Sequence, residues 1–291
     1  KVRLLGDPAP EVGKWIESVW REPGGRLFGW YHAEEPADCP GLTRRLFAPH
    51  IGALVSDDDG ASWRFLGELL RAPAREIDCG FANGFVTGGY GDFSVVGHDA
   101  FFYLHYSSYV ASEPSQGVCV ARIPIAARER PAGAVQHWRD GGWSLQDAST
   151  LPQPLLPVAR GWKHVDPTAF WGPALHFNRG LKYWVMLLNH AQGGRDIHQE
   201  GIYIAFSRDL ADPARLDCTA SHSEERLLVS AGDRLGAGRR RYRRRSGGAL
   251  LHRRRQRMGD PLRSRRARRH SVVKAASSHI ESPSWPGRAR P

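Results

Sequence analysis

The sequence is poor in cysteine, in long apolar runs and in helix-like stretches, and each absence limits what the chain can be. Its four cysteines, Cys39, Cys79, Cys119 and Cys218, lie far apart without CxxC or Cys/His ligand spacing. This spacing predicts buried free thiols rather than a zinc site or a disulfide framework, so no metal ion or cofactor is expected. No run of eighteen apolar residues occurs, and no membrane-spanning segment is expected.

Positive charge is also scarce in most of the chain, although the 291 residues carry a net charge of +11. From Ala231 onward there are 19 Lys and Arg residues against 3 Asp and Glu, a net of +16. Residues 1–230 have 22 against 27, a net of −5. The charge therefore predicts two parts, a folded domain over residues 1–230 and a basic tail over residues 231–291.

Short β-type runs fill the first part. Runs rich in β-branched and aromatic residues end at clusters of Gly, Pro, Asp and Asn, which is typical of strands and turns. These runs are RLFGWYH, IGALVS, FSVV, AFFYLHYSS, GVCVARI, YWVMLLN and GIYIAFS. Two exceptions, near Ile123–Arg130 and Ser207–Pro213, are typical of connecting turns with at most a turn or two of helix. The fold class is therefore expected to be all-β.

A weak internal repeat organises the strands. Three times an aromatic-rich strand precedes a strand that begins with Gly or Ile-Gly, and the second strands start near residues 51, 117 and 201. Such spacings suit propeller blades with long insertions. A two-sheet sandwich is the alternative, but the recurring pairs favour a β-propeller.

The most specific motif is SDDDGASW. It matches the Asp-box pattern S-x-D-x-G-x-S/T-W and resembles a turn between outer strands in sialidase-like and other glycosidase propellers. The matching residues are Ser56, Asp58, Gly60, Ser62 and Trp63. The SRDL segment at Asp209 resembles turns of five-bladed arabinanase- and invertase-type glycoside hydrolases. Because a turn carboxylate caps backbone N–H groups, Asp58 and Asp209 are expected to be structural.

Residues 11–217 as a whole resemble bacterial glycosidase-like propeller proteins. That resemblance implies a carbohydrate ligand and three carboxylates from three blades, which act as base, pKa modulator and acid. Transferred to this chain, it implies Glu34 as the acid, Asp92 as the base or nucleophile, and Asp166 as the residue that orients or tunes the acid. The chain has no NDPNG-like first-blade motif and no convincing arginine trio of the sialidase type.

The substrate-binding candidates are polar and aromatic residues at strand edges, because a propeller gathers such positions around a central funnel. Aromatic rings can stack on sugars, and His and Asn can bind hydroxyl groups. The candidates are Trp30, His32, Asn83, His105, Trp171, His176 and Asn178. The alternative interpretation gives each carboxylate and each of these side chains a structural role, as a turn, core or strand-end residue.

The tail supports two interpretations. Its arginines could contact nucleic-acid phosphates, but Tyr242 is the one Phe, Tyr or Trp between Leu235 and Arg269 that could stack on bases. Alternatively, reading arginine codons one base late converts the segment into strand-like sequence. We therefore hypothesise a frameshift in the region of Leu228 to Leu235, which would leave a five-bladed propeller with an incomplete last blade.

The sequence thus predicts a carbohydrate-active propeller, with glycoside hydrolysis by paired carboxyl groups as the leading function. Non-catalytic sugar binding and nucleic-acid binding through the tail are the alternatives. The chain begins at Lys1 rather than Met, so an upstream segment is expected. The sequence therefore does not indicate where the protein is located, and a secreted or periplasmic protein is compatible with it.

Overall fold

The computed structural model describes residues 3–147, 150–193, 197–219 and 229–230, which belong to the first of the two units of the chain, Lys1–Gly238. Regular structure in these residues consists of β-strands and four short 3-10 helices. None of the helices described there has the length and apolarity that a membrane crossing needs. The all-β class expected from the sequence is confirmed.

The first sheet, blade A, is an antiparallel meander of four strands extended by one parallel strand. The strand order is β1-β5-β4-β3-β2. The parallel pair is β1 with β5, with Arg3 opposite Ser62. The strands are β1 Arg3–Leu5, β2 Gly13–Arg21, β3 Leu27–Pro36, β4 Phe47–Ser56 and β5 Ser62–Leu70.

The second and third sheets, blades B and C, repeat this meander. Blade B has the order β10-β9-β8-β7-β6, with β11 also paired to β8, and blade C has the order β12-β13-β14-β15-β16. The strands of blade B are β6 Tyr90–His98, β7 Phe101–Ser108, β8 Gly117–Pro124, β9 Gln136–Arg139, β10 Gly142–Leu145 and β11 Leu156–Pro157. Those of blade C are β12 Ala169–Asn178, β13 Tyr183–Ala191, β14 Gln199–Ser207, β15 Asp217–Thr219 and β16 Val229–Ser230. The 3-10 helices lie in the connections, at η1 Ala74–Glu76, η2 Glu113–Ser115, η3 Ile125–Ala127 and η4 Pro213–Arg215.

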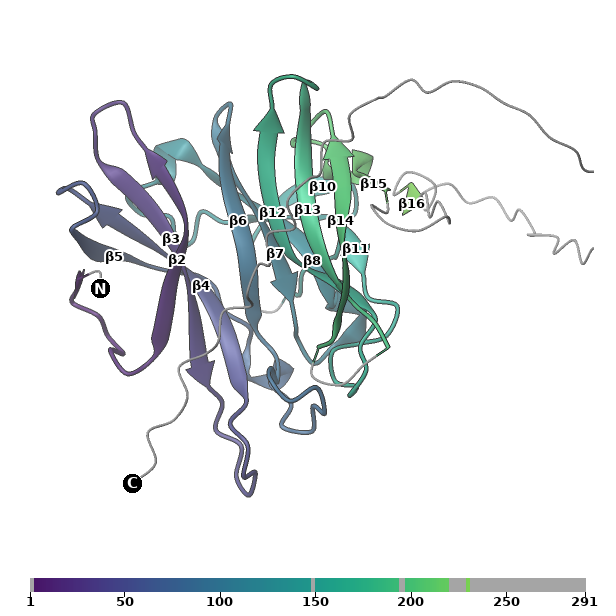
Figure 1. The fold of residues 1–291 in the computed structure, drawn as a ribbon. Helices are drawn as coiled ribbons and strands as arrows, with labels where there is room; N and C mark the ends of the chain where they lie inside the picture. Colours follow the sequence, from purple (N-terminus) through teal and green to yellow (C-terminus); the bar gives the residue numbers. More distant parts are fainter. Residues whose placement is uncertain (1–2, 148–149, 194–196, 220–228, 231–291) are drawn as a thin grey trace, which may run out of the picture. The chain divides into compact units, whose positions relative to one another are not determined.

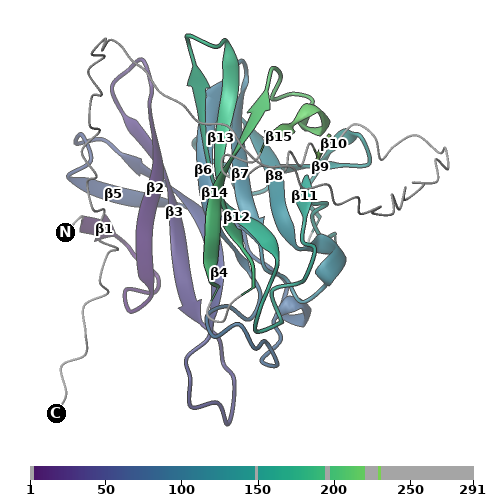
Figure 2. The ribbon, with the colours of Figure 1, turned by 45° about the vertical axis from the view of Figure 1, so that its right-hand side comes forward.

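The blades follow one another in chain order, and their first meander strands are neighbours. Strand β6 contacts both β2 and β12, and β12 also packs on β7 and β8 of blade B. Figure 1 shows the blue strand β6 between the purple sheet and the green strands, and Figure 2 shows the same sheets turned by 45°. This is the blade arrangement of a β-propeller, as predicted. The described residues form three such blades, so the predicted number of five stays a prediction.

The internal repeat corresponds to the two middle strands of each blade. The aromatic-rich runs form β3, β7 and β13, and the runs that begin with Gly or Ile-Gly form most of β4, β8 and β14. Strands β3, β4, β7 and β8 are largely buried, which explains their aromatic and β-branched composition, whereas β14 is partly exposed. The predicted short turns are also present, as the 3-10 helices Ile125–Ala127 and Pro213–Arg215.

Two apolar cores lie between the blades. The core between blades A and B contains Phe28 and Trp30 from β3 and Phe102 from β7, with Trp30 stacked edge-on against Phe102 at 4.8 Å between ring centroids. The core between blades B and C contains Tyr103 and Met186. Large side chains of this kind each contribute roughly 1.5–3 kcal/mol when fully buried, so these cores set the relative positions of the innermost strands.

The SDDDGASW turn between β4 and β5 is closed by hydrogen bonds among its own residues. The carboxylate of Asp58 accepts the backbone N–H of Ser62 at 2.8 Å and the hydroxyls of Ser56 and Ser62, while the indole of Trp63 donates to the Gly60 carbonyl at 3.0 Å. Gly60 adopts φ of +89°, which glycine tolerates. These hydrogen bonds, that of Ser62 first, lower the pKa of Asp58 to about 2. In blade C, Asp209 Oδ1 similarly accepts the N–H of Ala211 at 2.8 Å.

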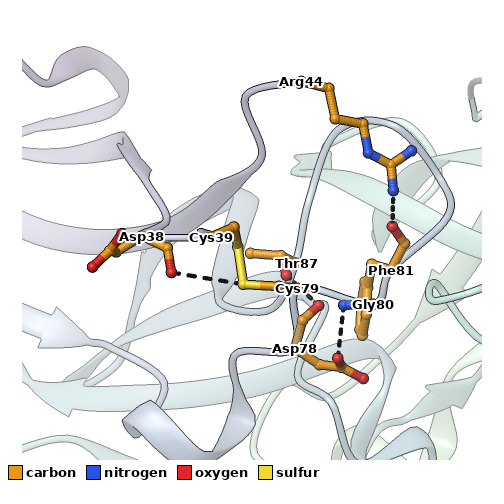
Figure 3. Close-up of a disulfide and its surroundings, with 8 residues drawn as sticks. All are labelled: Asp38, Cys39, Arg44, Asp78, Cys79, Gly80, Phe81 and Thr87. Carbon is orange, nitrogen blue, oxygen red and sulfur yellow. Dashed lines mark hydrogen bonds between the residues drawn. A yellow bond between two sulfur atoms is a disulfide. The ribbon is translucent and has the colours of Figure 1, made fainter. Parts of the chain in front are cut away.

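The prediction of four free thiols is wrong for two of them. Cys39 and Cys79 form a disulfide with a Cα–Cα distance of 5.5 Å, shown in Figure 3. The sequence separation of 40 gave no spacing signal, because blade A folds back and brings the loops after β3 and β5 together. Arg44 in the first loop also donates to the Phe81 carbonyl in the second (Figure 3). Cys119, in contrast, is a buried free thiol as predicted.

Residues 231–291 lie outside the described residues. The frameshift hypothesis, the nucleic-acid alternative and the predicted domain boundary after residue 230 therefore stay predictions.

Candidate functional site

A polar cluster lies where the core between blades A and B reaches the surface. Along β3, alternate residues Phe28, Trp30, His32 and Glu34 share one face because strand side chains have a period of two. Their burial changes steadily, from 2% exposure at Phe28 and 3% at Trp30 to 5% at His32, and Glu34 is half-buried. The core thus turns from aromatic to polar toward the end of β3.

Two backbone irregularities bring further carboxylates to this place. The pairing of β2 with β3 shifts between Ile16 and Ser18, so Glu17 is the extra residue of a bulge. The pairing of β6 with β7 shifts between Gly91 and Phe93, and Asp92 is the extra residue there, with φ of +42°. Bulges redirect a side chain, and a non-glycine residue with positive φ is strained unless its surroundings hold it. Both carboxylates are directed toward His32.

The distances define a compact cluster of Glu17, His32 and Asp92. The Oε1 of Glu17 lies 3.0 Å from Nδ1 of His32, and Oδ1 of Asp92 lies 4.0 Å from the same nitrogen. One ligand atom from each of the three residues can be chosen so that all lie within 4.8 Å of one another. The side chains of Glu17 and Asp92 are 26% and 34% exposed, so solvent reaches them.

The second oxygen of each carboxylate is held by the protein. Oε2 of Glu17 accepts the backbone N–H of Phe93 at 2.9 Å, and Oδ2 of Asp92 accepts the hydroxyl of Tyr109. The backbone N–H of Asp92 donates to Nδ1 of His32 at 3.2 Å. Gly91 is required beside the ring, because a Cβ there would lie 2.7 Å from His32 Cε1. The cluster is therefore fixed by contacts from both blades.

The electrostatics of the cluster reflect three neighbouring carboxyl groups. Burial raises the pKa of Glu34, with the charges of Asp92 and Glu17 adding to this effect and His32 opposing it. Burial likewise raises the pKa of Asp92, although His32 and the Tyr109 hydroxyl oppose the shift. Burial alone would lower the pKa of His32, but its hydrogen bond to Glu17 and the surrounding carboxylates raise it overall.

An exposed tryptophan borders the cluster. Trp15, two residues before Glu17 on β2, is 42% exposed, and its ring lies edge-on to His32 with centroids 5.8 Å apart. A partly exposed indole beside polar groups suits stacking on the apolar face of a planar or cyclic ligand.

Blade C is tied to the same region through its first strand. The hydroxyl of Ser107 donates to the carbonyl of Asp92 at 3.3 Å and accepts the N–H of Gly172 on β12 at 2.9 Å. Tyr109 packs edge-on against buried Trp162 with ring centroids 5.1 Å apart. The hydrogen bond to Asp92 therefore comes from a tyrosine whose position is set by the loop before β12.

The structure brings three of the sequence-predicted residues together: His32, Glu34 and Asp92. Asp166 lies in the loop before β12, where its Oδ1 is 2.9 Å from Nε of Arg160, and no contact in the described residues joins it to the cluster. Trp171, on β12, packs against the buried group that contains Phe81, Tyr109 and Trp162.

Three predicted binding residues are internal. Trp30 is 3% exposed, His105 2% and Asn83 0%. The Asn83 amide links two loops by donating to the Trp162 carbonyl at 2.5 Å and accepting from the N–H of Val86 at 2.9 Å. These side chains present almost no surface to a ligand in this structure.

The remaining two predicted binding residues lie at the other end of β12. His176 is exposed there, and Asn178 Oδ1 accepts the N–H of Leu181 at 2.9 Å in the turn to β13. Asn178 is thus a turn residue, and the length of the strand separates it from the start of β12, where Gly172 meets Ser107.

Glu17 and Trp15 were not predicted from the sequence, because GKWIESVWR lacks the composition of a buried strand. The signal that was missed is the order of the strands along the chain. Each aromatic-rich run follows another strand, and that preceding strand contains Glu17 in blade A and Asp92 in blade B.

No protein-family model matches the chain, and no curated protein matches it. Among solved structures, the chain is similar to an endo-1,5-α-L-arabinanase from Thermotoga petrophila, with 17% identity, a TM-score of 0.38, and coverage of 67% of this chain and 37% of that one. It is similar to an α-L-arabinofuranosidase from Fusarium graminearum, with 13% identity, a TM-score of 0.37, and coverage of 69% and 46%. For a family 117 glycoside hydrolase from Zobellia galactanivorans, the identity is 14%, the TM-score is 0.39, and the coverage is 73% and 63%. The chain therefore spans between 37% and 63% of the length of these enzymes.

Proposed function

We propose that this chain is a carbohydrate-active hydrolase whose reaction centre is the cluster of Glu17, His32, Glu34 and Asp92. The observation that carries the proposal is the convergence of three carboxyl groups from β2, β3 and β6 beside the exposed indole of Trp15. Cleavage of a glycosidic bond requires a carboxyl group that donates a proton and a second that acts as base or nucleophile. Stacking of a sugar ring on Trp15 would place its bonds next to these groups.

Glu34 is the proposed proton donor. Among the hydrogen bonds of the described residues, none engages its side-chain oxygens, and it is half-buried at the end of β3. A carboxyl group free of protein partners can bind a leaving-group oxygen. Asp92 is the proposed base or nucleophile, because Tyr109 holds only its Oδ2 and leaves Oδ1 available.

Asp166 stays a proposal for the third role, that of orienting or tuning the acid. Its ion pair with Arg160 lies at the surface, since both side chains are nearly half exposed. The link from Gly172 through Ser107 to the Asp92 carbonyl places the beginning of β12 beside the cluster. A substrate that extends toward blade C would pass this loop.

The test is a screen of the full chain against aryl glycosides and plant and algal oligosaccharides, followed by Glu34→Gln and Asp92→Asn on any substrate that is cleaved. Each variant is expected to lower kcat at least 100-fold, because general acid–base catalysis contributes about that much. Glu35→Gln is the matched control: the neighbouring carboxylate points to the other face of β3 and pairs with Arg71 at 2.5 Å.

Two results would contradict the proposal. Full activity in both carboxylate variants would place the reaction elsewhere. Binding of a glycan without any cleavage, at equal affinity in Glu34→Gln and the parent chain, would instead support the non-catalytic sugar-binding alternative.

A further inference from the structure

The cluster of Glu17, His32 and Asp92 has a charge imbalance that the protein itself does not correct. Within the described residues, the ion pairs of Glu17 and Asp92 are with His32 alone, and Glu34 has none, so neither Lys nor Arg neutralises these carboxylates. Elsewhere in blade A the carboxylates of Glu35 and Glu68 share Arg71. A buried charged group is normally paired or coordinates a metal ion, and His32, which both carboxylates approach, is 5% exposed.

Nδ1 of His32, Oε1 of Glu17 and Oδ1 of Asp92 face one another across a small space. Nδ1 lies 3.2 Å from the backbone N of Asp92 and 3.0 Å from Oε1 of Glu17, and its single in-plane position serves only one of these two contacts at a time. Two acceptors at this distance repel each other unless a proton or a cation lies between them. Oδ1 of Asp92 completes the set at 4.0 Å from Nδ1.

The surroundings resemble the support that metal ligands receive. Each carboxylate uses its other oxygen for a fixed hydrogen bond, Glu17 with the Phe93 N–H and Asp92 with the Tyr109 hydroxyl. Such outer contacts orient ligands and are typical of metal centres. The imidazole lies edge-on to Trp15 and against Gly91, with Nδ1 near both carboxylates.

We propose that Oε1 of Glu17, Nδ1 of His32 and Oδ1 of Asp92 bind one divalent cation that accepts imidazole together with carboxylate, such as Mn²⁺ or Zn²⁺. Ligand atoms about 2.0–2.2 Å from such an ion lie about 3–4 Å apart, and shifts of a few tenths of an ångström to about 1 Å in the partly exposed Glu17 and Asp92 side chains would achieve this. Ca²⁺ is a poorer match because it takes six to eight oxygen ligands. Three protein ligands would leave open positions on the solvent side, next to Glu34. The cation would occupy the Oδ1 of Asp92 that the proposed function assigns to the base or nucleophile, so these two roles of Oδ1 are alternatives.

Cation binding is tested directly on the full chain after treatment with EDTA. Isothermal titration calorimetry and Mn²⁺ electron paramagnetic resonance are expected to show one site per chain. Glu17→Gln and Asp92→Asn are each expected to weaken binding at least tenfold, whereas Glu35→Gln leaves it unchanged. Thermal melts of every variant establish that it is folded, and Trp15→Phe, which changes no ligand, should retain the parent affinity.

Failure to bind any divalent cation at millimolar concentration would overturn the inference, because a proton on His32 would then be the only charge balancing the cluster. Binding that is equal in the parent, Glu17→Gln and Asp92→Asn chains would overturn it as well. The measurement needs no substrate. A chain that binds the cation but cleaves no glycan therefore contradicts the proposed hydrolase and leaves the cation site intact. A chain that cleaves a glycan but binds no cation contradicts the cation site and leaves the proposed hydrolase intact.

Discussion

The hydroxyl of Ser18 on β2 accepts the backbone N–H of Val95 on β6, at 2.9 Å, and joins blade A to blade B. The same link recurs one blade later, where Ser94 Oγ accepts the N–H of Leu175 on β12 at 3.0 Å. Both serines follow a bulge that carries a carboxylate of the candidate site, Glu17 or Asp92. The first meander strand of blade A and that of blade B therefore each carry a link to the next blade and a bulge with a carboxylate of the candidate site.

Replacing either serine with alanine is expected to destabilise the protein by about 1–3 kcal/mol, because a backbone N–H between blades loses its partner. Urea unfolding measures the change, with Ser144→Ala on exposed β10 as the control. An equal and negligible effect of all three variants would show that these hydrogen bonds do not hold the blades together.

The disulfide between Cys39 and Cys79 is expected to stabilise the folded chain by about 2–4 kcal/mol, because it restricts the unfolded chain across 40 positions. The Cys39→Ser/Cys79→Ser double variant should melt at a lower temperature than the oxidised parent. A reducing agent should lower the melting temperature of the parent to that of the double variant and leave the double variant unaffected. A parent chain indifferent to reduction would contradict the bond.

Replacement by alanine should have different effects at buried Trp30 and at exposed Trp15. Trp30→Ala is expected to cost about 3–5 kcal/mol of unfolding free energy, since the ring is 3% exposed and packs on Phe102. Trp15→Ala should cost little stability, because the ring is 42% exposed, but should weaken carbohydrate binding. Calorimetric melts and glycan titrations separate the two effects. Loss of glycan affinity in a folded Trp30→Phe variant but not in Trp15→Ala would reverse the assignment.

Stability is expected to fall as the pH decreases from about 6.5 to about 4. Burial lowers the pKa of His105 and of His137 to about 4, below the value of 6.5 for an unperturbed histidine. In this window the unfolded chain takes up protons that the folded chain does not, so acid favours unfolding, by roughly 3 kcal/mol per histidine at the lower end. Above pH 6.5 both states are neutral and the effect is absent.

Urea unfolding between pH 5 and pH 7 measures this dependence. A His105→Gln variant should show a shallower slope than the parent, while His176→Gln, at an exposed position, should keep the parent slope. Identical slopes in all three chains would contradict the assignment of His105 as a buried neutral residue.

Much of the fold was predictable because it depends on local patterns. The aromatic runs that became β3, β7 and β13 are buried in the middle of their sheets, and burial on both faces imposes a composition that is visible in the sequence. The turn at Asp58 was predictable for a similar reason, since its hydrogen bonds join residues at most four positions apart. Strand β2 was missed because it is exposed on one face and carries Lys, Glu and Ser.

The candidate site was predictable only in part. His32 and Glu34 were identified from their place at the polar end of an aromatic strand, and Asp92 from its glycine-rich surroundings. Trp30 was taken for a ligand contact because it precedes His32 by two residues. It shares the face of His32 but lies deeper, and the depth of a residue along a strand depends on which sheet packs against it.

By itself, the sequence determined the class of the fold, the three repeated strand pairs and the short-range pattern of the Asp58 turn. These features follow from composition and from contacts within a few residues. Only the tertiary structure decided that Glu17 and Asp92 meet His32, that Asp166 pairs with Arg160, and that Cys39 bonds to Cys79. Each of these contacts except the Asp166 pair joins residues on different strands or loops far apart in the chain, and bulges or packing between sheets, which leave no local signature, set their distances.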